Sequence, residues 1–518
     1  MTPVEQNAIL TQTGPGTPLG NVFRRYWIPA LLSRELGKIA VRSKILSEDM
    51  WAKRDESGKV TFRTRQVPTL ELGVVYQENW LPVLLSEDLP EVDCAPVRVQ
   101  IGEEKLIAFR DTSGRIGLID QFCAHRRVSL FFGRNEENGI RCPYHGWKFD
   151  VNGKCLEVPS EGENSKTCER VQLKNYRTVE TGGVIFAYIG AEAELPALDF
   201  TPELVPATVN EYPAIEVGDV VWVYMGPADK MPKAPEFEWA TVPASHRYVN
   251  YRVQRSNWLQ AMEGGIDSSH VSSLHSGELH KDPLHHGKGA SNQADKSPIF
   301  EVAPSPAGLL IGAKRKTAEG NAYWRISQYV FPSSTMIPPY GEHPLHGHNW
   351  VPVDDSSCLT WNFSHTPHRP LSEEEIETMD NYGSIYAELI PGTHNTVQNE
   401  SNDWLIDREK QKTGRYYSGI KGIAMQDGSL QESMAGENGI VDRTKERLVA
   451  TDVAIVQARR KLVATAQALA AGDESALAGL DPTSHHIRPA SFEAAYDTTL
   501  AVATEKIVAD ASVVPTSI

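Results

Sequence analysis

Cys123-Ala-His125 and Cys142-Pro-Tyr-His145 decide the fold of this part of the chain, because they form two short metal-binding motifs separated by sixteen residues. Each motif holds one cysteine and one histidine on what can be one tight loop. Two such loops facing each other can enclose a 2Fe–2S cluster, with thiolates on one iron and imidazoles on the other. Structural zinc is the alternative, but its ligands usually come as C-x2–4-C and H-x3–5-H pairs. The mixed pairs, with Gly133 between them and Pro143 and Trp147 shaping the second, favour the cluster.

The run Cys142-Pro-Tyr-His-Gly-Trp-Lys-Phe-Asp150, together with Cys123-x-His125, resembles the Rieske domain of ring-hydroxylating oxygenases. In this type of cluster two imidazoles replace two thiolates, which raises the reduction potential. We therefore interpret Cys123, His125, Cys142 and His145 as ligands of a 2Fe–2S cluster. A protein with such a cluster accepts electrons, and the remainder of the chain is expected to use them.

The composition limits the classes of protein to consider. The 518 residues allow two to four domains. The net charge of −16 argues against nucleic-acid binding, which needs basic surfaces. Six cysteines are too few for a disulfide scaffold and fit a reducing compartment. With no signal-peptide pattern at the start and no run of 18 apolar residues, we expect a cytoplasmic protein without a membrane span.

Apolar patterning predicts an α+β protein. Residues 97–190 alternate short apolar runs with turns, which indicates a small antiparallel β-domain. Residues 245–330 combine a helix with strands, whereas residues 370–388 and 440–470 are expected to be helical. The expected segments are an N-terminal segment 1–90, a cluster domain 91–190, a connection 191–240, a catalytic domain 241–470 and a peripheral tail 471–518.

Two stretches of the chain occur twice. Tyr26-Trp-Ile-Pro-Ala-Leu-Leu-Ser33 recurs as Asn79-Trp-Leu-Pro-Val-Leu-Leu-Ser86, and the pattern of residues 176–196 recurs in residues 212–232. Two copies are too few for a solenoid. The simplest interpretation is a partial tandem duplication with insertions at residues 37–78 and 191–226. Which copy of each repeat holds the original position stays open.

A second metal motif is Asp267-Ser-Ser-His270-Val-Ser-Ser-Leu-His275. Two histidines and a carboxylate suit a non-haem Fe(II) centre that leaves positions open for oxygen. At about 100° per residue, Asp267 and His270 share a helix face, whereas His275 lies roughly 140° from His270. Both histidines reach one metal only if the helix ends or takes a π-type turn between Val271 and Leu274. The alternative is that these are ordinary polar residues on a loop.

The third iron ligand is expected to be a carboxylate from further along, and five candidates suit it by chemistry: Asp403, Asp407, Asp427, Glu432 and Asp442. Stretches around these residues, such as Gln426-Asp427-Gly-Ser-Leu-Gln-Glu-Ser433, resemble the phthalate dioxygenase group, although residues 434–439 depart from its pattern.

The resemblance implies Asp427 as the third ligand beside His270 and His275. It also implies that Asp267 bridges an iron-binding histidine to the neighbouring subunit's cluster histidine, which corresponds to His145. Such a carboxylate orients both imidazoles by accepting their N–H bonds.

The resemblance runs from about Gly14 to Arg460 and implies a Rieske β-domain followed by a helix-grip catalytic domain. It implies a 2Fe–2S cluster and Fe(II), a homotrimer or hexamer, and an NADH-dependent reductase with flavin and ferredoxin centres as partner. The implied reaction is hydroxylation of a small aromatic compound with O2. An aromatic carboxylate would need a buried cation, for which the candidates are Arg325, Lys314, Arg315 and Lys316.

Three other functions fit parts of the same sequence. An oxidative O-demethylase of a methoxylated aromatic acid would use the same metals. A Rieske electron carrier without catalysis would need only the cluster, and it is disfavoured by the second metal motif. A helix-grip protein that binds a ligand without turnover would not need the four cluster ligands.

Overall fold

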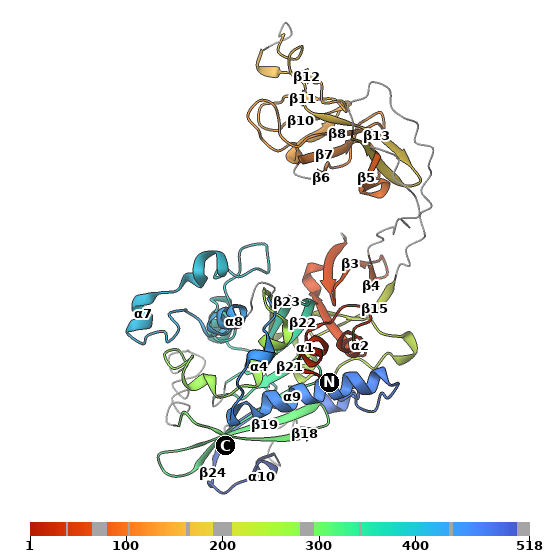
Figure 1. The fold of residues 1–518 in the computed structure, drawn as a ribbon. Helices are drawn as coiled ribbons and strands as arrows, with labels where there is room; N and C mark the ends of the chain where they lie inside the picture. The colour runs from red at the N-terminus through yellow and green to blue at the C-terminus, as the bar shows by residue number, and fades with distance from the viewer. Residues whose placement is uncertain are drawn as a thin grey trace. The chain divides into compact units, whose positions relative to one another are not determined.

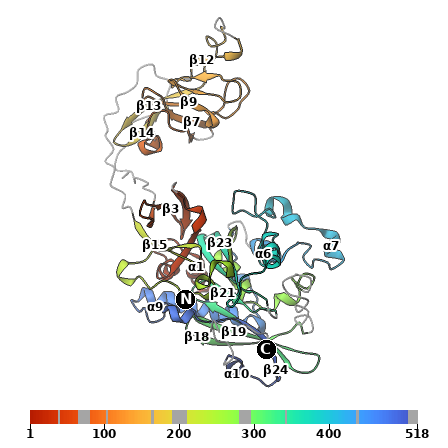
Figure 2. The same ribbon diagram turned by 180° about the vertical axis from the view of Figure 1, so that it is seen from behind.

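The computed structural model describes residues 1–37, 40–64, 80–101, 104–161, 166–189, 210–279, 295–340, 343–434 and 439–504. The chain divides into two compact units, of which residues 66–208 form one and residues 1–65 with 209–518 form the other. We call them the inserted unit and the outer unit, because the first interrupts the second in the sequence. Figures 1 and 2 show both from opposite sides. The expected segments 1–90 and 191–240 are thus each divided between the units.

The inserted unit contains two antiparallel sheets, as the alternation of apolar runs and turns predicts. The larger sheet has the order β5-β14-β13-β8-β7-β6, with β5 (Trp80–Leu85), β6 (Val97–Ile101), β7 (Glu104–Arg110), β8 (Ile116–Asp120), β13 (Asn175–Thr181) and β14 (Val184–Tyr188). The smaller has the order β12-β11-β10-β9, with β9 (Arg134–Glu136), β10 (Gly139–Arg141), β11 (Lys148–Phe149) and β12 (Cys155–Glu157). Its buried clusters of apolar side chains come from its own residues.

The outer unit begins with a six-stranded antiparallel sheet of the order β1-β16-β15-β4-β3-β2. Its strands are β1 (Trp27–Leu32), β2 (Val41–Ile45), β3 (Glu48–Arg54), β4 (Val60–Thr64), β15 (Glu211–Val217) and β16 (Val220–Tyr224). Residues 37–78 and 191–226 were expected from the repeats to be insertions. Five of the six strands lie in these ranges, so much of both is integral to a sheet.

A second, eight-stranded antiparallel sheet forms the centre of the outer unit, in the order β17-β23-β22-β21-β20-β19-β18 with β24 paired to β20. Its strands are β17 (Arg247–Gln254), β18 (Ile299–Ser305), β19 (Gly308–Lys316), β20 (Ala322–Val330), β21 (Ser334–Ile337), β22 (Leu345–Asp354), β23 (Ser357–His365) and β24 (Ala490–Ala494). Because β24 completes this sheet, the expected peripheral tail is integral as far as residue 494. Residues 505–518 lie outside the described part.

The outer unit also contains helices, several of which pack against strands of this sheet. They are α1 (Pro3–Thr11), α2 (Pro18–Phe23), α3 (Glu238–Thr241), α4 (Trp258–Ile266), α6 (Glu373–Asp380), α7 (Arg408–Lys412), α8 (Ile423–Ser433), α9 (Val453–Ala470) and α10 (Leu500–Thr504). The long helix α9 lies along α1 and α2 and buries Leu462 and Ala466 in the same core as the strands (Figure 1). The expected helices 370–388 and 440–470 correspond to α6 and α9, which are shorter.

Aromatic stacking joins the two sheets of the outer unit into one core. Trp222 of β16 stacks on Trp239 of α3 with ring centroids 6.0 Å apart, and Trp239 stacks on Phe363 of β23 at 4.7 Å. Burial of such large apolar side chains is the main favourable contribution to folding. Among the described helices, none is both long and apolar enough to cross a membrane.

Candidate iron–sulfur and mononuclear iron sites

The first candidate site lies on two tight loops of the inserted unit, one after β8 and one between β10 and β11. The amide of Cys123 donates to the carbonyl of Val128 at 2.9 Å, and the amide of Cys142 donates to that of Trp147 at 2.8 Å. These bonds close each loop directly behind its cysteine. The structure therefore builds both loops that the motifs predict.

Both cysteines of these loops are buried, with 1–2% of their surface exposed, and both histidines lie further out. The ring centroids of His125 and His145 are 4.5 Å apart. Burial raises the pKa of Cys123 to about 11, with a further contribution from the adjacent Cys142. A bound metal reverses this effect, because it coordinates and stabilises the thiolate. Inner sulfur donors and outer nitrogen donors fit the two unlike irons of a 2Fe–2S cluster.

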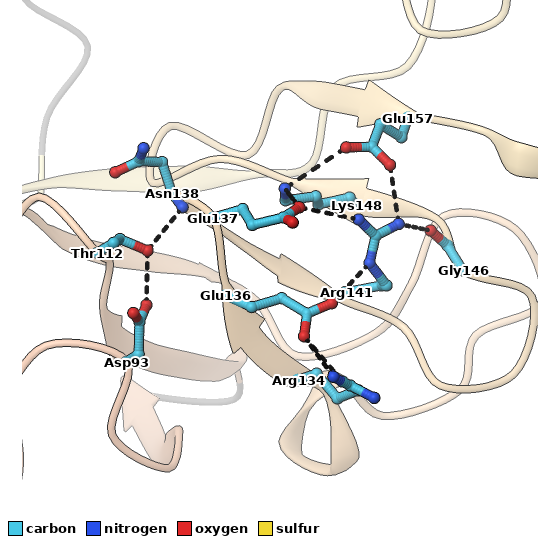
Figure 3. Close-up of polar contacts among 10 residues, drawn as sticks. All are labelled: Asp93, Thr112, Arg134, Glu136, Glu137, Asn138, Arg141, Gly146, Lys148 and Glu157. Carbon is cyan, nitrogen blue, oxygen red and sulfur yellow. Dashed lines mark hydrogen bonds and ion pairs between the residues drawn. The ribbon is translucent and has the colours of Figure 1, made fainter.

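The side chains around the second loop hold it in place (Figure 3). Arg141 donates to the carbonyl of Gly146 at 3.0 Å and to the carboxylates of Glu136 and Glu157, each at 2.9 Å. Charged hydrogen bonds of this kind are roughly twice as strong as neutral ones. On the outer side of the site, Trp147 stacks on His125 with its ring plane only 2° from parallel. The orientation of both histidine loops is thus fixed by neighbouring side chains.

The second candidate site brings together His270, His275 and Asp427, as the resemblance implies. The Nε2 atoms of the two histidines are 3.2 Å apart, and they lie 3.5 and 3.3 Å from Asp427 Oδ1. Ligand atoms about 2.1 Å from one metal lie roughly 3 Å apart when they occupy adjacent positions. Two nitrogens and one oxygen in this arrangement would suit a non-haem iron, a metal that such a triad binds with coordination positions left open.

The local structure of this motif differs from the expected helix. Helix α4 ends at Ile266, Asp267 is its extended C-cap, and residues His270–Ser272 form a single 3-10 turn. The prediction that Asp267 and His270 share a helix face is therefore wrong, and the irregularity comes earlier than expected. Gly264 and Gly265 lie in the last turn of the helix under close packing, since a side chain at Gly265 would meet the Trp350 ring at 2.4 Å.

Asp267 contacts His270 directly, with its Oδ2 3.4 Å from His270 Nδ1. Burial raises the pKa of Asp267, but hydrogen bonds from His270 and Ser269 outweigh this effect and lower it to about 2. Conversely, burial lowers the pKa of His270, while Asp267 and the charge of Asp427 raise it to about 9. Asp267 is thus an anion at neutral pH and orients the imidazole.

Gln426 is a further residue of this site that the sequence did not indicate. Its Oε1 lies 2.7 Å from His275 Nδ1, and its Nε2 donates to the carbonyl of Ile420 at 3.0 Å. The second bond fixes the amide so that its oxygen faces the histidine, which then carries its proton on Nδ1 and presents Nε2. The only sequence signal for this role is its position next to Asp427.

The other candidate carboxylates have other partners. Asp407 and Asp442 accept bonds from backbone amides at the start of α7 and of the 3-10 helix Arg443–Lys445, respectively. Glu432 accepts from the amide of Arg255 and from the indole of Trp404. Asp403 is exposed. In the part of the chain that the structure describes, Asp427 is the candidate carboxylate that reaches both histidines.

A cavity of about 110 Å3 opens beside the three converging ligands. Most of its wall is apolar, with Leu279, Ile337 and Ile385 among the lining residues. Arg252 and Arg325 also line it. These two residues are 5% and 3% exposed, and the Nε and Nη1 atoms of both are buried with no hydrogen-bond partner among the described residues. A buried, unpaired N–H is costly, so these arginines are suited to an anionic ligand.

The other cations considered from the sequence do not line this cavity. Arg315 is buried and donates to the carbonyl of Ser268. Lys314 lies 5.3 Å from the ring of Trp324 and 3.6 Å from a carboxylate oxygen of Glu301. Lys316 is exposed. As the alternation of strand side chains predicts, only some of the candidates face inward, and Arg325 is the one that reaches the cavity.

Comparison with known proteins agrees with both sites. Residues 79–177 match the Rieske [2Fe-2S] domain, and residues 223–507 match the family described as LigXa C-terminal domain like. The chain is 33% identical to the phthalate 4,5-dioxygenase oxygenase subunit of Pseudomonas putida, over 78% of this chain and 84% of that protein. The chain belongs to the Rieske non-haem iron oxygenases.

Two further relatives of this Rieske oxygenase are informative. The 3-chlorobenzoate-3,4-dioxygenase oxygenase subunit of Comamonas testosteroni is 32% identical over 76% of this chain and 84% of its own length. The 5,5'-dehydrodivanillate O-demethylase oxygenase subunit of a Sphingobium species is 24% identical over 93% of this chain and 84% of its own length. The family assignment confirms an oxidoreductase with a Rieske 2Fe–2S cluster and a mononuclear iron. It also confirms the expected α+β fold of a Rieske β-domain and a larger catalytic domain.

Proposed function

We propose that this Rieske oxygenase uses O2 to hydroxylate an aromatic carboxylate, with electrons delivered by an NADH-dependent reductase that carries flavin and ferredoxin centres. The observation that carries the proposal is the buried guanidinium of Arg325 in the cavity beside His270, His275 and Asp427. Two relatives, named for phthalate and 3-chlorobenzoate, support an aromatic acid as substrate.

In this proposal each metal group has its own ligands. Cys123 and Cys142 would hold one iron of the cluster and His125 and His145 the other, whereas His270, His275 and Asp427 would hold the mononuclear iron. When bound, the cluster supplies electrons and the mononuclear iron activates oxygen.

The protein is proposed to work as a homotrimer or hexamer in which Asp267 links His270 to the partner subunit's His145. None of the six cysteines forms a disulfide, which fits the reducing cytoplasm, where NADH is available.

The side chains of the cavity have separate tasks. The planar fork of Arg325 suits both oxygens of a carboxylate, and one of its nitrogens is already fixed by the carbonyl of Pro338 at 3.1 Å. Tyr340 lies under the guanidinium, which is 4.1 Å from the ring centroid, and limits its movement. The apolar wall excludes water from the bound ring and strengthens this charged contact.

Oxidative O-demethylation of a methoxylated aromatic acid is the second candidate. It is favoured by the Sphingobium relative, which aligns over 93% of this chain. A product assay separates the two reactions, because ring dioxygenation yields a cis-diol and O-demethylation yields formaldehyde.

The Arg325→Gln variant tests the substrate class. Loss of a charged, buried hydrogen-bonding fork is expected to raise the KM for aromatic acids roughly 10- to 100-fold. The KM for the corresponding neutral amides should change only a few-fold, as measured by substrate-dependent O2 consumption with reductase present. Arg255→Gln, at an exposed arginine just after β17, is the control. Equal changes for acids and amides would show that Arg325 does not bind a carboxylate.

A further inference from the structure

The first sheet of the outer unit has the same topology as the large sheet of the inserted unit. The order β1-β16-β15-β4-β3-β2 becomes β5-β14-β13-β8-β7-β6 when each strand is replaced by its counterpart. In both sheets the first four strands in the chain are followed by a long connection and then by the last two. The strand roles therefore correspond one to one.

Their registers also agree residue by residue. Trp27 faces Tyr224 in the outer sheet, and Trp80 faces Tyr188 in the inserted one. In each case the pairing then shifts by one residue just after the proline of the first strand. A shift at the same place is a conformational feature that a chance likeness of sequence would not reproduce.

The turn after the third strand is built from the same contacts in both sheets. Arg54 of β3 binds Glu216, and Arg110 of β7 binds Glu180. The Nη1 atom of each arginine also donates to a glycine carbonyl four residues on, at 3.3 Å. The aspartate that follows each arginine accepts amides two and four residues further along. The local sequences are Arg54-Asp-Glu-Ser-Gly-Lys-Val60 and Arg110-Asp-Thr-Ser-Gly-Arg-Ile116.

The two sheets differ in the long connection. Between β8 and β13 the inserted sheet carries both cysteine–histidine motifs and the small sheet β9–β12. At the same place, between β4 and β15, the outer sheet carries the whole inserted unit. The two ends of the inserted unit leave the outer sheet at neighbouring positions, since the amide of Thr64 donates to the carbonyl of Asn210 at 3.0 Å. Adjacent ends are what a domain insertion requires. The six outer strands contain neither cysteine nor histidine.

The outer sheet belongs to the catalytic core in its contacts. Its buried side chains share one apolar cluster with β17–β23 and α9. The amides of Leu46 and Ser47 donate to the carbonyls of Pro352 and Val353 at 2.9 and 2.8 Å. Lys44 adds an ion pair to Asp354 at 2.8 Å. These contacts fix the sheet to the end of β22, one of the central strands.

We propose that residues 27–64 and 210–226 are a second, cluster-free copy of the Rieske sheet, and that the cluster-bearing copy is inserted where a Rieske domain holds its metal loops. The cluster-free copy is a fixed part of the catalytic unit and serves as the platform to which both ends of the electron-donating unit are attached. The chain then has two Rieske-type sheets but a single entry point for electrons.

Matched variants of the full-length holoprotein test this arrangement. Nine of the eleven tryptophans lie in the outer unit, so thermal unfolding can be followed there by fluorescence, and in the inserted unit by bleaching of the cluster's visible absorption. Arg54→Ala is expected to lower the fluorescence midpoint by a few degrees and leave the bleaching midpoint unchanged, whereas Arg110→Ala should do the reverse. If either alanine variant cannot be purified, Arg54→Lys and Arg110→Lys replace the pair, because lysine keeps the charge but lacks the fork.

Three results would overturn the proposal. In the first, both variants lower both midpoints together, which would make the two sheets one cooperative unit. In the second, neither variant shifts the midpoint of the unit that carries the substitution. Acid-labile sulfide could also be four rather than the expected two per chain, which would place a second cluster in the outer copy. None of these measurements depends on the substrate or on the mononuclear iron, so their outcome is separate from that of the proposed reaction.

Discussion

Gln426→Ala is expected to weaken iron binding without affecting the 2Fe–2S cluster. Gln426 is fully buried and its Oε1 lies 2.7 Å from Nδ1 of His275, a proposed iron ligand. Its removal leaves the Nδ1–H of this histidine without an acceptor in a buried place. It also frees the carbonyl of Ile420, to which Gln426 Nε2 donates at 3.0 Å.

The expected size of the effect follows from these contacts. A buried donor that loses its acceptor costs about 1–3 kcal/mol. Since about 1.4 kcal/mol corresponds to a tenfold change, the Kd for Fe(II) should rise roughly 10- to 100-fold, the range found when residues behind a metal ligand are replaced. Gln426→Glu restores an acceptor for His275 and should recover most of the affinity.

Iron affinity can be measured by competition with a coloured chelator, while the visible spectrum of the cluster in the inserted unit serves as an internal reference. Gln328→Ala is the matched control, since Gln328 is equally buried and donates to the carbonyl of Arg488 at 3.0 Å but touches no metal ligand. Gln426 does not support iron binding through His275 if Gln426→Ala binds iron as tightly as the parent protein, or if Gln328→Ala weakens binding as much.

Two other predictions concern stability. Burial raises the pKa of Glu238, but Arg488 and His365 outweigh it and lower the pKa to about 2. A depressed carboxylate pKa stabilises the fold above pH ~4.5, and this contribution is lost as the pH falls towards 2. Glu238→Gln should therefore remove up to about 3 kcal/mol from the free energy of unfolding at neutral pH and make that free energy less dependent on pH in the acid range of a urea-unfolding series. Arg141→Met should lower the temperature at which the cluster bleaches by several degrees, because it removes the bonds to Glu136, Glu157 and the Gly146 carbonyl. An unchanged bleaching curve would show that this network does not support the loop.

The cysteine–histidine pairs and the histidine pair were the most predictable part of the candidate metal sites, because the members of each pair are close in sequence. Cys123 and His125 share one loop, as do Cys142 and His145, so their spacing alone indicates a shared metal group. His270 and His275 are five residues apart, and the requirement that both reach one metal correctly excluded a regular helix between them. The exact place where α4 ends was not predicted, and the close packing of its last turn, with Gly265 against Trp350 85 residues away, is not visible in the local sequence.

Contacts between distant parts of the chain set the limit of sequence reasoning here. Gln426 orients His275 across 151 residues, and nothing in its neighbourhood distinguishes it from a solvated glutamine. Arg325 could be named as a candidate from its strand, but its burial at a cavity depends on how β20 packs against the rest of the outer unit. Long-range packing, rather than local pattern, gives both residues their place in the site.

The repeats show why residue identity alone could not reveal the nested arrangement. Two repeated pairs allow either of two pairings, because the first copy of the Trp-x-Pro strand could meet either copy of the later hairpin. If the inner copies pair, one sheet forms from the continuous segment 80–188, and the outer copies form the other sheet around it. If instead each inner copy paired with an outer copy, both sheets would be discontinuous in sequence and interleaved. The third repeat, Arg54–Val60 and Arg110–Ile116, is only seven residues long, yet it shows that both copies of the first four strands precede both copies of the last two. Short, uncrossed connections favour the nested pairing, and the observed pairs β1 with β16 and β5 with β14 show it. Residues 41–64 are therefore strands of the enclosing copy rather than an insertion.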